Sequence, residues 1–206
     1  MMKKKNKIIG LVLCSILFIY FIGGIIYNFT DKDNKSNKKK TDNSIVIKGF
    51  DYILYDNDLD IYKSEFKILK NNLESDEINY KDYAYSISKM FIIDLYSLDN
   101  KINKYDVGGI DFVYPESRDN FRLNVENTLN KYIKDNTDGD RKQELPIVKN
   151  VNINSDEEIK FKIGEIEYDA YKIKLSIEYV KDLEYDNEAE LIIIRNDKYL
   201  YVVEKN

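Results

Sequence analysis

The spacing of apolar residues changes from helical to strand-like roughly two thirds of the way along this 206-residue chain. Between residues 59 and 134, apolar side chains recur every three or four positions, which is typical of amphipathic helices. From residue 147 onward they alternate with polar side chains, as in strands that bury one face. Helices followed by strands predict an α+β fold, with about three helices packed on a curved antiparallel sheet.

The first two predicted helices cover residues 59–73 and 79–98, after a short extended segment at residues 45–55. Asn57 or Asp58 is the expected N-cap of the first helix, because a short polar side chain accepts hydrogen bonds from the free N–H groups there. The apolar face of the second helix is formed by Ala84, Ile87, Phe91, Leu95 and Leu98.

A short strand at residues 107–114 and a third helix at residues 117–134 are expected next. Gly108 and Gly109 open the strand with a positive-φ turn or a bulge, and Pro115 ends it. The inner face of the third helix is predicted to consist of Phe121, Val125, Thr128, Leu129 and Tyr132.

The clearest strand pattern lies at residues 171–179, where tyrosine, isoleucine and leucine alternate with lysine, serine and glutamate. Further strands are expected at residues 147–153, 159–163, 189–195 and 199–204. The dipeptide Asn196-Asp197 is a two-residue hairpin turn signal between the last two strands.

Composition excludes several kinds of chemistry. The chain has no histidine, no tryptophan and one cysteine, Cys14. These counts exclude Ser-His and Cys-His nucleophile pairs, His-ligated zinc, intrachain disulfides and thiolate metal clusters, and no cofactor is expected. Residues 45–206 hold 23 basic and 34 acidic residues, which makes the domain a poor match for nucleic acid.

An uncharged apolar run at residues 8–29 follows a basic tail at residues 1–7. As a helix, these 22 residues would measure about 33 Å, enough to cross a bilayer core of about 30 Å. Two alternatives fit less well. A cleaved signal would place the bulky Ile22 where a small residue is required. A lipoprotein would also need a small residue just before the lipidated Cys14, where the chain has Leu11-Val12-Leu13. We expect an uncleaved, single-pass anchor in the lipid bilayer of the cell membrane.

Residues 30–44 contain no apolar side chain and are expected to tether the anchor to a globular domain at residues 45–206. The formal net charge is +6 over residues 1–44 and −11 over residues 45–206. The lysines directly ahead of the anchor favour an extracytoplasmic domain, and the lysines of the tether leave a cytoplasmic domain as the alternative.

Asp94 lies on the buried face of the second predicted helix, between Phe91 and Leu98. A buried carboxylate needs a partner, since an unpaired one costs several kcal/mol. We expect that partner to be Lys101, Arg118 or Arg122. One interpretation of Asp94 is therefore a structural ion pair.

The alternative interpretation of Asp94 is an acid–base or ligand group in a pocket, with Tyr96, Tyr132 and Tyr171 as candidate hydroxyl companions. No metal site is expected at the aspartates of residues 56–60, because Ile61 and Lys67 stand where an EF-hand requires glycine and glutamate. The glycines at residues 108–109 also lack the spacing of a phosphate-binding loop.

The order of elements over residues 58–204 resembles the nuclear-transport-factor-two-like superfamily, in which three helices and a bent sheet form a cone. Enzymes of that superfamily use a carboxylate in the mouth of the cone. A single transmembrane helix ahead of such a domain also resembles assembly subunits of bacterial type IV secretion and conjugation systems. That second resemblance implies a non-enzymatic scaffold that oligomerises or recruits protein partners.

Five residues also resemble a signature of uncharacterised membrane proteins from low-GC Gram-positive bacteria, and this resemblance implies no activity. They are Asp94, Lys101, Asp106, Gly108 and Gly109. We therefore expect a membrane-anchored, non-enzymatic interaction or assembly module of a bacterial cell envelope, which binds a protein partner or a second copy. The alternative is a small-ligand-binding protein or carboxylate-dependent enzyme with a pocket near Asp94.

Overall fold

The computed structural model describes residues 44–206. The predicted basic tail, the anchor at residues 8–29, Cys14 and the tether up to residue 43 lie outside the described residues. Among the helices of residues 44–206, none combines the length and the apolar composition that crossing a membrane requires.

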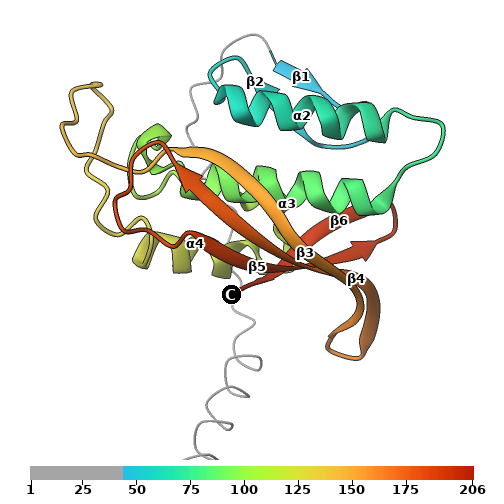
Figure 1. The fold of residues 1–206 in the computed structure, drawn as a ribbon. Coiled ribbons are helices and arrows are strands. Elements are labelled where there is room, and N and C mark those ends of the chain that lie inside the picture. The colour runs from blue at the N-terminus through green and yellow to red at the C-terminus, as the bar shows by residue number, and fades with distance from the viewer. Residues whose placement is uncertain (1–43) are drawn as a thin grey trace, which may run out of the picture. The chain divides into compact units, whose positions relative to one another are not determined.

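Three α-helices and a four-stranded antiparallel sheet make up the described domain (Figure 1), which confirms the predicted α+β class. The helices are α2 (Asp60–Leu73), α3 (Tyr80–Tyr96) and α4 (Arg118–Asn127). The strands lie in the order β3 (Val148–Ile163), β4 (Ile166–Tyr179), β5 (Glu188–Asn196) and β6 (Tyr199–Lys205). A separate two-stranded sheet pairs β1 (Ser44–Val46) with β2 (Ile53–Tyr55).

Helix α3 lies between α2 and the sheet and forms the centre of the core (Figure 1). Eleven of its 17 residues are buried, and they include Ile87, Phe91 and Leu95 from the predicted face. A helix that is apolar on most of its circumference has to be covered on both sides. Its N-cap is Asn79, whose side chain accepts hydrogen bonds from two backbone N–H groups of the first turn, at 3.1 Å each.

Strand β4 shows the alternation that the sequence predicts. Ile173, Leu175 and Ile177 are buried in the core that contains α3. Its hairpin with β3 extends past the rest of the sheet, because β5 pairs with β4 only from Ala170 to Ser176. The two-residue turn between β5 and β6 is Asp197-Lys198, one position later than predicted, because Asn196 pairs with Tyr199 and Asp197 has a φ of 57°.

The predicted strand at residues 107–114 is wrong. Short 3-10 turns at Ile110–Phe112 and Pro115–Ser117 occupy this region, and one parallel bridge, Val113 with Val202, touches the sheet. Gly109 has a φ of +76°, and its carbonyl accepts the N–H of Phe112 at 3.1 Å. This left-handed residue turns the chain and prevents an extended strand.

The third predicted helix is shorter than expected, since α4 ends at Asn127 instead of Lys134. The side chains of Asn127 and Thr128 bond to the carbonyls of Leu123 and Asn124, each at 2.7 Å, and so compete with continuation of the helix. Tyr132 therefore lies beyond the helix, and it is 76% exposed instead of lying on the predicted inner face.

The predicted N-cap of the first helix is also wrong, because the cap position of α2 is Leu59 and no side chain caps it. The Asp58 carboxylate instead accepts the N–H of Tyr55 at 2.7 Å. This bond closes the turn between β2 and α2.

Candidate functional site

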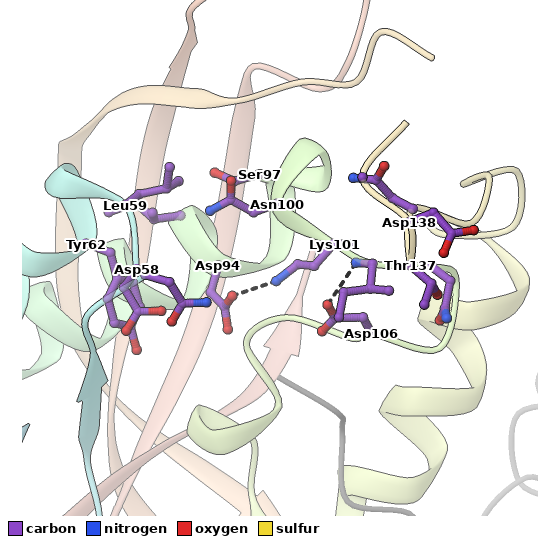
Figure 2. Close-up of a pocket in the computed structure, with 16 residues that line it drawn as sticks. Asp58, Leu59, Tyr62, Asp94, Ser97, Asn100, Lys101, Asp106, Thr137 and Asp138 are labelled. Atoms are coloured by element: carbon purple, nitrogen blue, oxygen red, sulfur yellow. Dashed lines mark hydrogen bonds and ion pairs between the residues drawn. The ribbon is translucent and has the colours of Figure 1, made fainter. Parts of the chain in front are cut away.

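A cleft with a volume of about 760 Å³ lies where the start of α2, the end of α3 and the turn at residues 136–139 meet (Figure 2). Twelve of its sixteen lining residues have polar side chains. The carboxylates are Asp58, Asp94, Asp106 and Asp138, and the amides are Asn57, Asn100, Asn103 and Asn136. Ser97, Thr137, Tyr62 and Lys101 complete the polar set.

Asp94 lies in the centre of this cleft and is held on both carboxylate oxygens (Figure 2). Lys101 Nζ lies 2.6 Å from its Oδ1, and the N–H of Gly109 donates to its Oδ2 at 2.7 Å. The Lys101 side chain is 2% exposed and the Asp94 side chain 20%, so the ammonium is desolvated and the carboxylate is partly so. Such a pair holds the two side chains in place, because the loss of either one would leave the other as an uncompensated buried charge.

Of the three predicted partners of Asp94, Lys101 is the one that pairs with it. The two arginines are engaged elsewhere. Arg118 donates to the carbonyl oxygens of Val113 and Asp111, at 3.1 and 3.0 Å. Arg122 pairs with Asp119 on the exposed side of α4.

The local chain path explains why Asp94 and Lys101 meet. Helix α3 ends at Tyr96 because Ser97 has a ψ of 73°, and a 3-10 turn at Leu98–Asn100 then reverses the chain. Lys101 therefore points back toward the last turns of α3. Segment 107–109 closes over this pair from the other side.

The two glycines of that segment have different roles. A Cβ on Gly108 would lie 2.0 Å from the carbonyl oxygen of Asp94 and 2.6 Å from Lys101 Nζ, so only glycine allows the backbone to pass this close. Gly109 has a φ of +76°, and a Cβ there would also lie 2.8 Å from the Phe91 ring. The positive-φ expectation therefore describes Gly109, whereas close packing against α3 explains Gly108.

Asp106 lines the cleft on the same side as Asp94 and Lys101. Its Oδ2 accepts the N–H of Ile102 at 3.0 Å, and Asn130 donates to the backbone carbonyls of Lys104 and Asp106. The structure thus brings together the five residues of the sequence signature. Asp94 binds Lys101 and the N–H of Gly109, Gly108 packs against Asp94 and Lys101, and Asp106 accepts the N–H of the residue after Lys101.

Tyr62 was not among the sequence-predicted site residues, yet it lines the cleft near Asp94 and Asp58 (Figure 2). Burial raises the pKa of its hydroxyl well above the usual value, and the Asp94 and Asp58 carboxylates raise it further. The hydroxyl is therefore a neutral donor and acceptor at physiological pH. Tyr62 lies within the amphipathic pattern of residues 59–73, where an aromatic side chain is typical of the core, so the sequence alone does not single it out.

The three predicted hydroxyl companions of Asp94 lie away from this cleft. Tyr96 is buried in the core at 3% exposure, with Lys205 Nζ 5.5 Å from its ring centre. Tyr132 is exposed, and Tyr171 lies on β4, packed against the core beneath the sheet. None of the three is among the residues that line the cleft.

The far wall of the cleft is the turn at residues 136–139, which Arg141 ties to the segment after α3. The Arg141 guanidinium donates to the carbonyl oxygens of Asp99 at 2.6 Å, Lys101 at 2.8 Å and Lys134 at 3.3 Å. Its side chain is only 2% exposed. The N–H of Asn136 also donates to the carbonyl of Ile102 at 2.8 Å.

The chemistry of this lining suits a cation better than an anion. Four carboxylates face one ammonium, and that ammonium already pairs with Asp94. Within residues 44–206, no group of three or more acidic, histidine or cysteine side chains is arranged to hold a metal ion. A cleft with an excess of one sign of charge concentrates ligands of the opposite sign.

Comparison with known proteins assigns no family, because the chain matches no protein-family model, no curated protein and no solved structure.

Proposed function

We propose that this chain is a membrane-anchored, non-enzymatic binding module, and that its cleft beside Asp94 holds a positively charged group. The single observation that carries this proposal is the lining of the cleft. Among the described residues that line it, the carboxylates Asp58, Asp94, Asp106 and Asp138 outnumber the ammonium of Lys101.

The geometry of Asp94 favours binding over proton transfer. A general acid or base has to reach the proton that it moves. Both oxygens of Asp94 are instead committed to Lys101 and to the backbone of Gly109, at 2.6 and 2.7 Å. The carboxylate therefore supports the wall of a preformed cleft, which lowers the ordering cost of binding.

The other lining groups suit a ligand with a short aliphatic part and a primary ammonium, such as a lysine side chain. Leu59 and Ile93 offer apolar surface, and the Tyr62 hydroxyl and the asparagine amides accept hydrogen bonds. Ammonium groups donate three hydrogen bonds and accept none, so a lining rich in acceptors suits them.

The remaining parts of the proposal rest on the sequence. They are the anchor at residues 8–29, an extracytoplasmic location in a bacterial envelope, and a role in assembly such as that of secretion or conjugation subunits. We also propose that the domain is a divergent relative of the nuclear-transport-factor-two-like cone. The three helices and the four-stranded antiparallel sheet support that relationship.

The proposal is tested by thermal unfolding of the full chain in detergent micelles with two probes of equal carbon number and opposite charge. Cadaverine carries two ammonium groups, and glutarate carries two carboxylates. We expect cadaverine to stabilise the domain saturably, by about 1.4 kcal/mol at ten times its Kd, and glutarate to have no effect. An equal effect of both probes, or none, would contradict the proposal.

A pair of matched variants locates the effect. Asp138→Asn removes one exposed carboxylate from the cleft and is expected to reduce the cadaverine response. Asp76→Asn removes the same charge from the exposed loop beyond the far end of α2, about 20 Å along the helix, and is expected to leave the response intact. Equal responses of the two variants would indicate non-specific attraction to an acidic domain.

A further inference from the structure

The outer edge of β3 carries unpaired backbone groups. Strand β3 is the first in the order of the four-stranded sheet, so β4 is its only neighbour among the described strands. Within residues 44–206, no backbone hydrogen bond joins residues 155–163 to a segment other than β4. None of these nine residues is buried. A row of free N–H and C=O groups along a strand is a template for a further strand.

Only one part of this edge is protected by bulges. Natural sheets use bulges to prevent pairing with another strand at an open edge. The part of β3 before Ser155 has two register irregularities, whereas from Ser155 to Ile163 the ladder is regular. The regular part continues onto a hairpin arm that extends past the rest of the sheet (Figure 1), because β5 pairs with no residue of β4 before Ala170.

The hairpin turn decides which backbone groups point to the open edge. A two-residue turn at residues 164–165 joins Ile163 to Ile166, and the residues that flank such a turn bond to each other. Backbone groups alternate in direction along a strand, so those of the odd-numbered residues in 155–163 point to β4. The residues whose N–H and C=O groups point to the open edge are therefore Asp156, Glu158, Lys160 and Lys162.

The charges of these four residues follow a self-complementary order, with the two acidic residues before the two basic ones. Two copies of the strand can pair antiparallel about a two-fold axis only when outward-pointing residues face each other, so the axis has to pass through a residue. An axis at Glu158 or Lys160 places that residue opposite its own copy. An axis at residue 157 or 161 also places two like charges opposite each other.

Only an axis at Ile159 places opposite charges together throughout the segment. The pairs are then Glu158 with Lys160 and Asp156 with Lys162, each formed twice. Opposite charges that face each other across two strands stabilise the pairing, and like charges weaken it.

The groups already beside these residues are compatible with this register. Within one copy the two lysines pair with carboxylates of β4, Lys160 with Asp169 and Lys162 with Glu167. Each lysine would therefore lie in a row between two carboxylates, one from β4 and one from the second copy. Asp156 pairs with Lys81 of α3 at 2.7 Å and would gain a second ammonium.

The opposite face of the same strand adds an apolar contact. Ile159 would pack against its own copy, with Phe161 of the second copy diagonal to it. Both side chains are partly buried and belong to one apolar cluster, so the cluster would continue across the axis. Glu157 lies opposite Phe161 in this register and meets no like charge.

We propose that the open edge of β3 pairs antiparallel with the same edge of a second copy, centred on Ile159, so that the two four-stranded sheets form one. A two-fold contact places a segment against itself in the reverse direction, and an acidic half followed by a basic half suits that reversal. A strand from another protein would have to supply the charge order that this chain itself provides. The contact is separate from the cleft, so its failure would leave the binding proposal intact.

Sedimentation equilibrium of the full chain in detergent micelles tests the proposal with two charge reversals. In a pair of identical copies, Glu158→Lys places lysine opposite lysine and Lys160→Glu places glutamate opposite glutamate. Each variant alone is expected to dimerise about tenfold more weakly than the parent. An equimolar mixture of the two variants places opposite charges together again, and we expect it to dimerise as the parent does.

A control variant and a second readout locate the contact. Lys67→Glu makes the same change of charge as Lys160→Glu at an exposed position of α2, and it is expected to dimerise as the parent does. Backbone hydrogen exchange should be slowed at Glu158 and Lys160 in the dimer and not in the two separate reversal variants, because these amides point to the open edge.

Three results would overturn the proposal. A parent chain that stays monomeric at the highest concentration reached would leave the edge to a segment of another protein. A dimer that neither reversal weakens more than Lys67→Glu does would place the contact elsewhere. Two weakened variants whose mixture does not recover would show that the reversals disturb the domain and that the strands do not pair about Ile159.

Discussion

Lys101 Nζ lies 2.6 Å from Oδ1 of Asp94, seven residues earlier in the chain, and the backbone of Gly108 packs directly against both residues. The N–H of Gly109 donates to the other oxygen of Asp94 at 2.7 Å, so Asp94 joins the end of α3 to segment 107–109. It also sets the central wall of the cleft.

Replacing Gly108 with alanine is expected to destabilise the domain by about 3 kcal/mol, because the new Cβ would lie 2.0 Å from the Asp94 carbonyl oxygen. Gly139→Ala is the matched control. Gly139 has a φ of +75° with no atom within 4 Å of a Cβ, so its variant carries only the backbone cost of about 1 to 2 kcal/mol. Urea unfolding of both variants measures the difference, and equal losses would contradict close packing at Gly108.

Lys101→Met is expected to cost about 3 kcal/mol, because it leaves the Asp94 carboxylate without its ammonium partner. Asp94→Asn retains the size of the side chain and isolates the charge. A double-mutant cycle of the two substitutions should give a coupling free energy of about 1 to 3 kcal/mol. Additive losses would show that the two side chains do not stabilise each other.

Stability is expected to fall above pH 10, because the hydroxyls of Tyr52 and Tyr83 are buried and lie 2.6 Å apart. Burial raises the pKa of both hydroxyls well above the usual value of 10. The folded state therefore holds these protons after the unfolded state has released them, so their contribution is complete below pH 10 and is lost as the pH rises beyond it.

The double variant Tyr52→Phe, Tyr83→Phe keeps both rings and is expected to flatten this alkaline loss. Urea midpoints between pH 8 and about 12 measure it. Tyr132→Phe is the control, because Tyr132 is 76% exposed and its variant should lose stability as the parent does. An unchanged alkaline slope in the double variant would contradict the assignment.

Arg141→Lys is expected to loosen the far wall of the cleft, because a lysine cannot reproduce the fork that reaches the carbonyls of Asp99, Lys101 and Lys134. Backbone hydrogen exchange should accelerate at residues 136–139 and remain unchanged in β4 and β5. Arg122→Lys, on the exposed side of α4, should change neither region. Uniform acceleration across the domain would indicate general destabilisation instead.

The elements predicted well from sequence are those whose apolar spacing alone decides their position. Helix α3 and strand β4 are examples, since Phe91 and Ile173 belong to long regular patterns that only one conformation can bury. The strand predicted at residues 107–114 does not form, because a single left-handed residue, Gly109, turns the chain before the apolar run that follows it. The last turns predicted for α4 do not form, because the side chains of Asn127 and Thr128 bond to the backbone carbonyls of Leu123 and Asn124.

Some residues of the candidate site could be predicted from the sequence, and others could not. Asp94 could be found because a carboxylate on an apolar face needs a partner, and Lys101 was among the few cations near it in sequence. Tyr62 lies within the apolar helical pattern of residues 59–73, which is typical of a core residue, and Arg141 lies in a segment with no periodicity. Their roles arise from contacts between distant segments, such as Arg141 with the carbonyl of Asp99, which no local pattern encodes.

The most direct test of the binding cleft is a nitrogen-15 NMR titration of the full chain with cadaverine. Saturable shifts should be confined to the amides of residues 100–109 and 136–139, and Asp138→Asn should weaken them while Asp76→Asn does not. Shifts spread over the acidic surface of the domain, with none of these amides moved more than the others, would contradict the proposal that the cleft beside Asp94 binds a positively charged group.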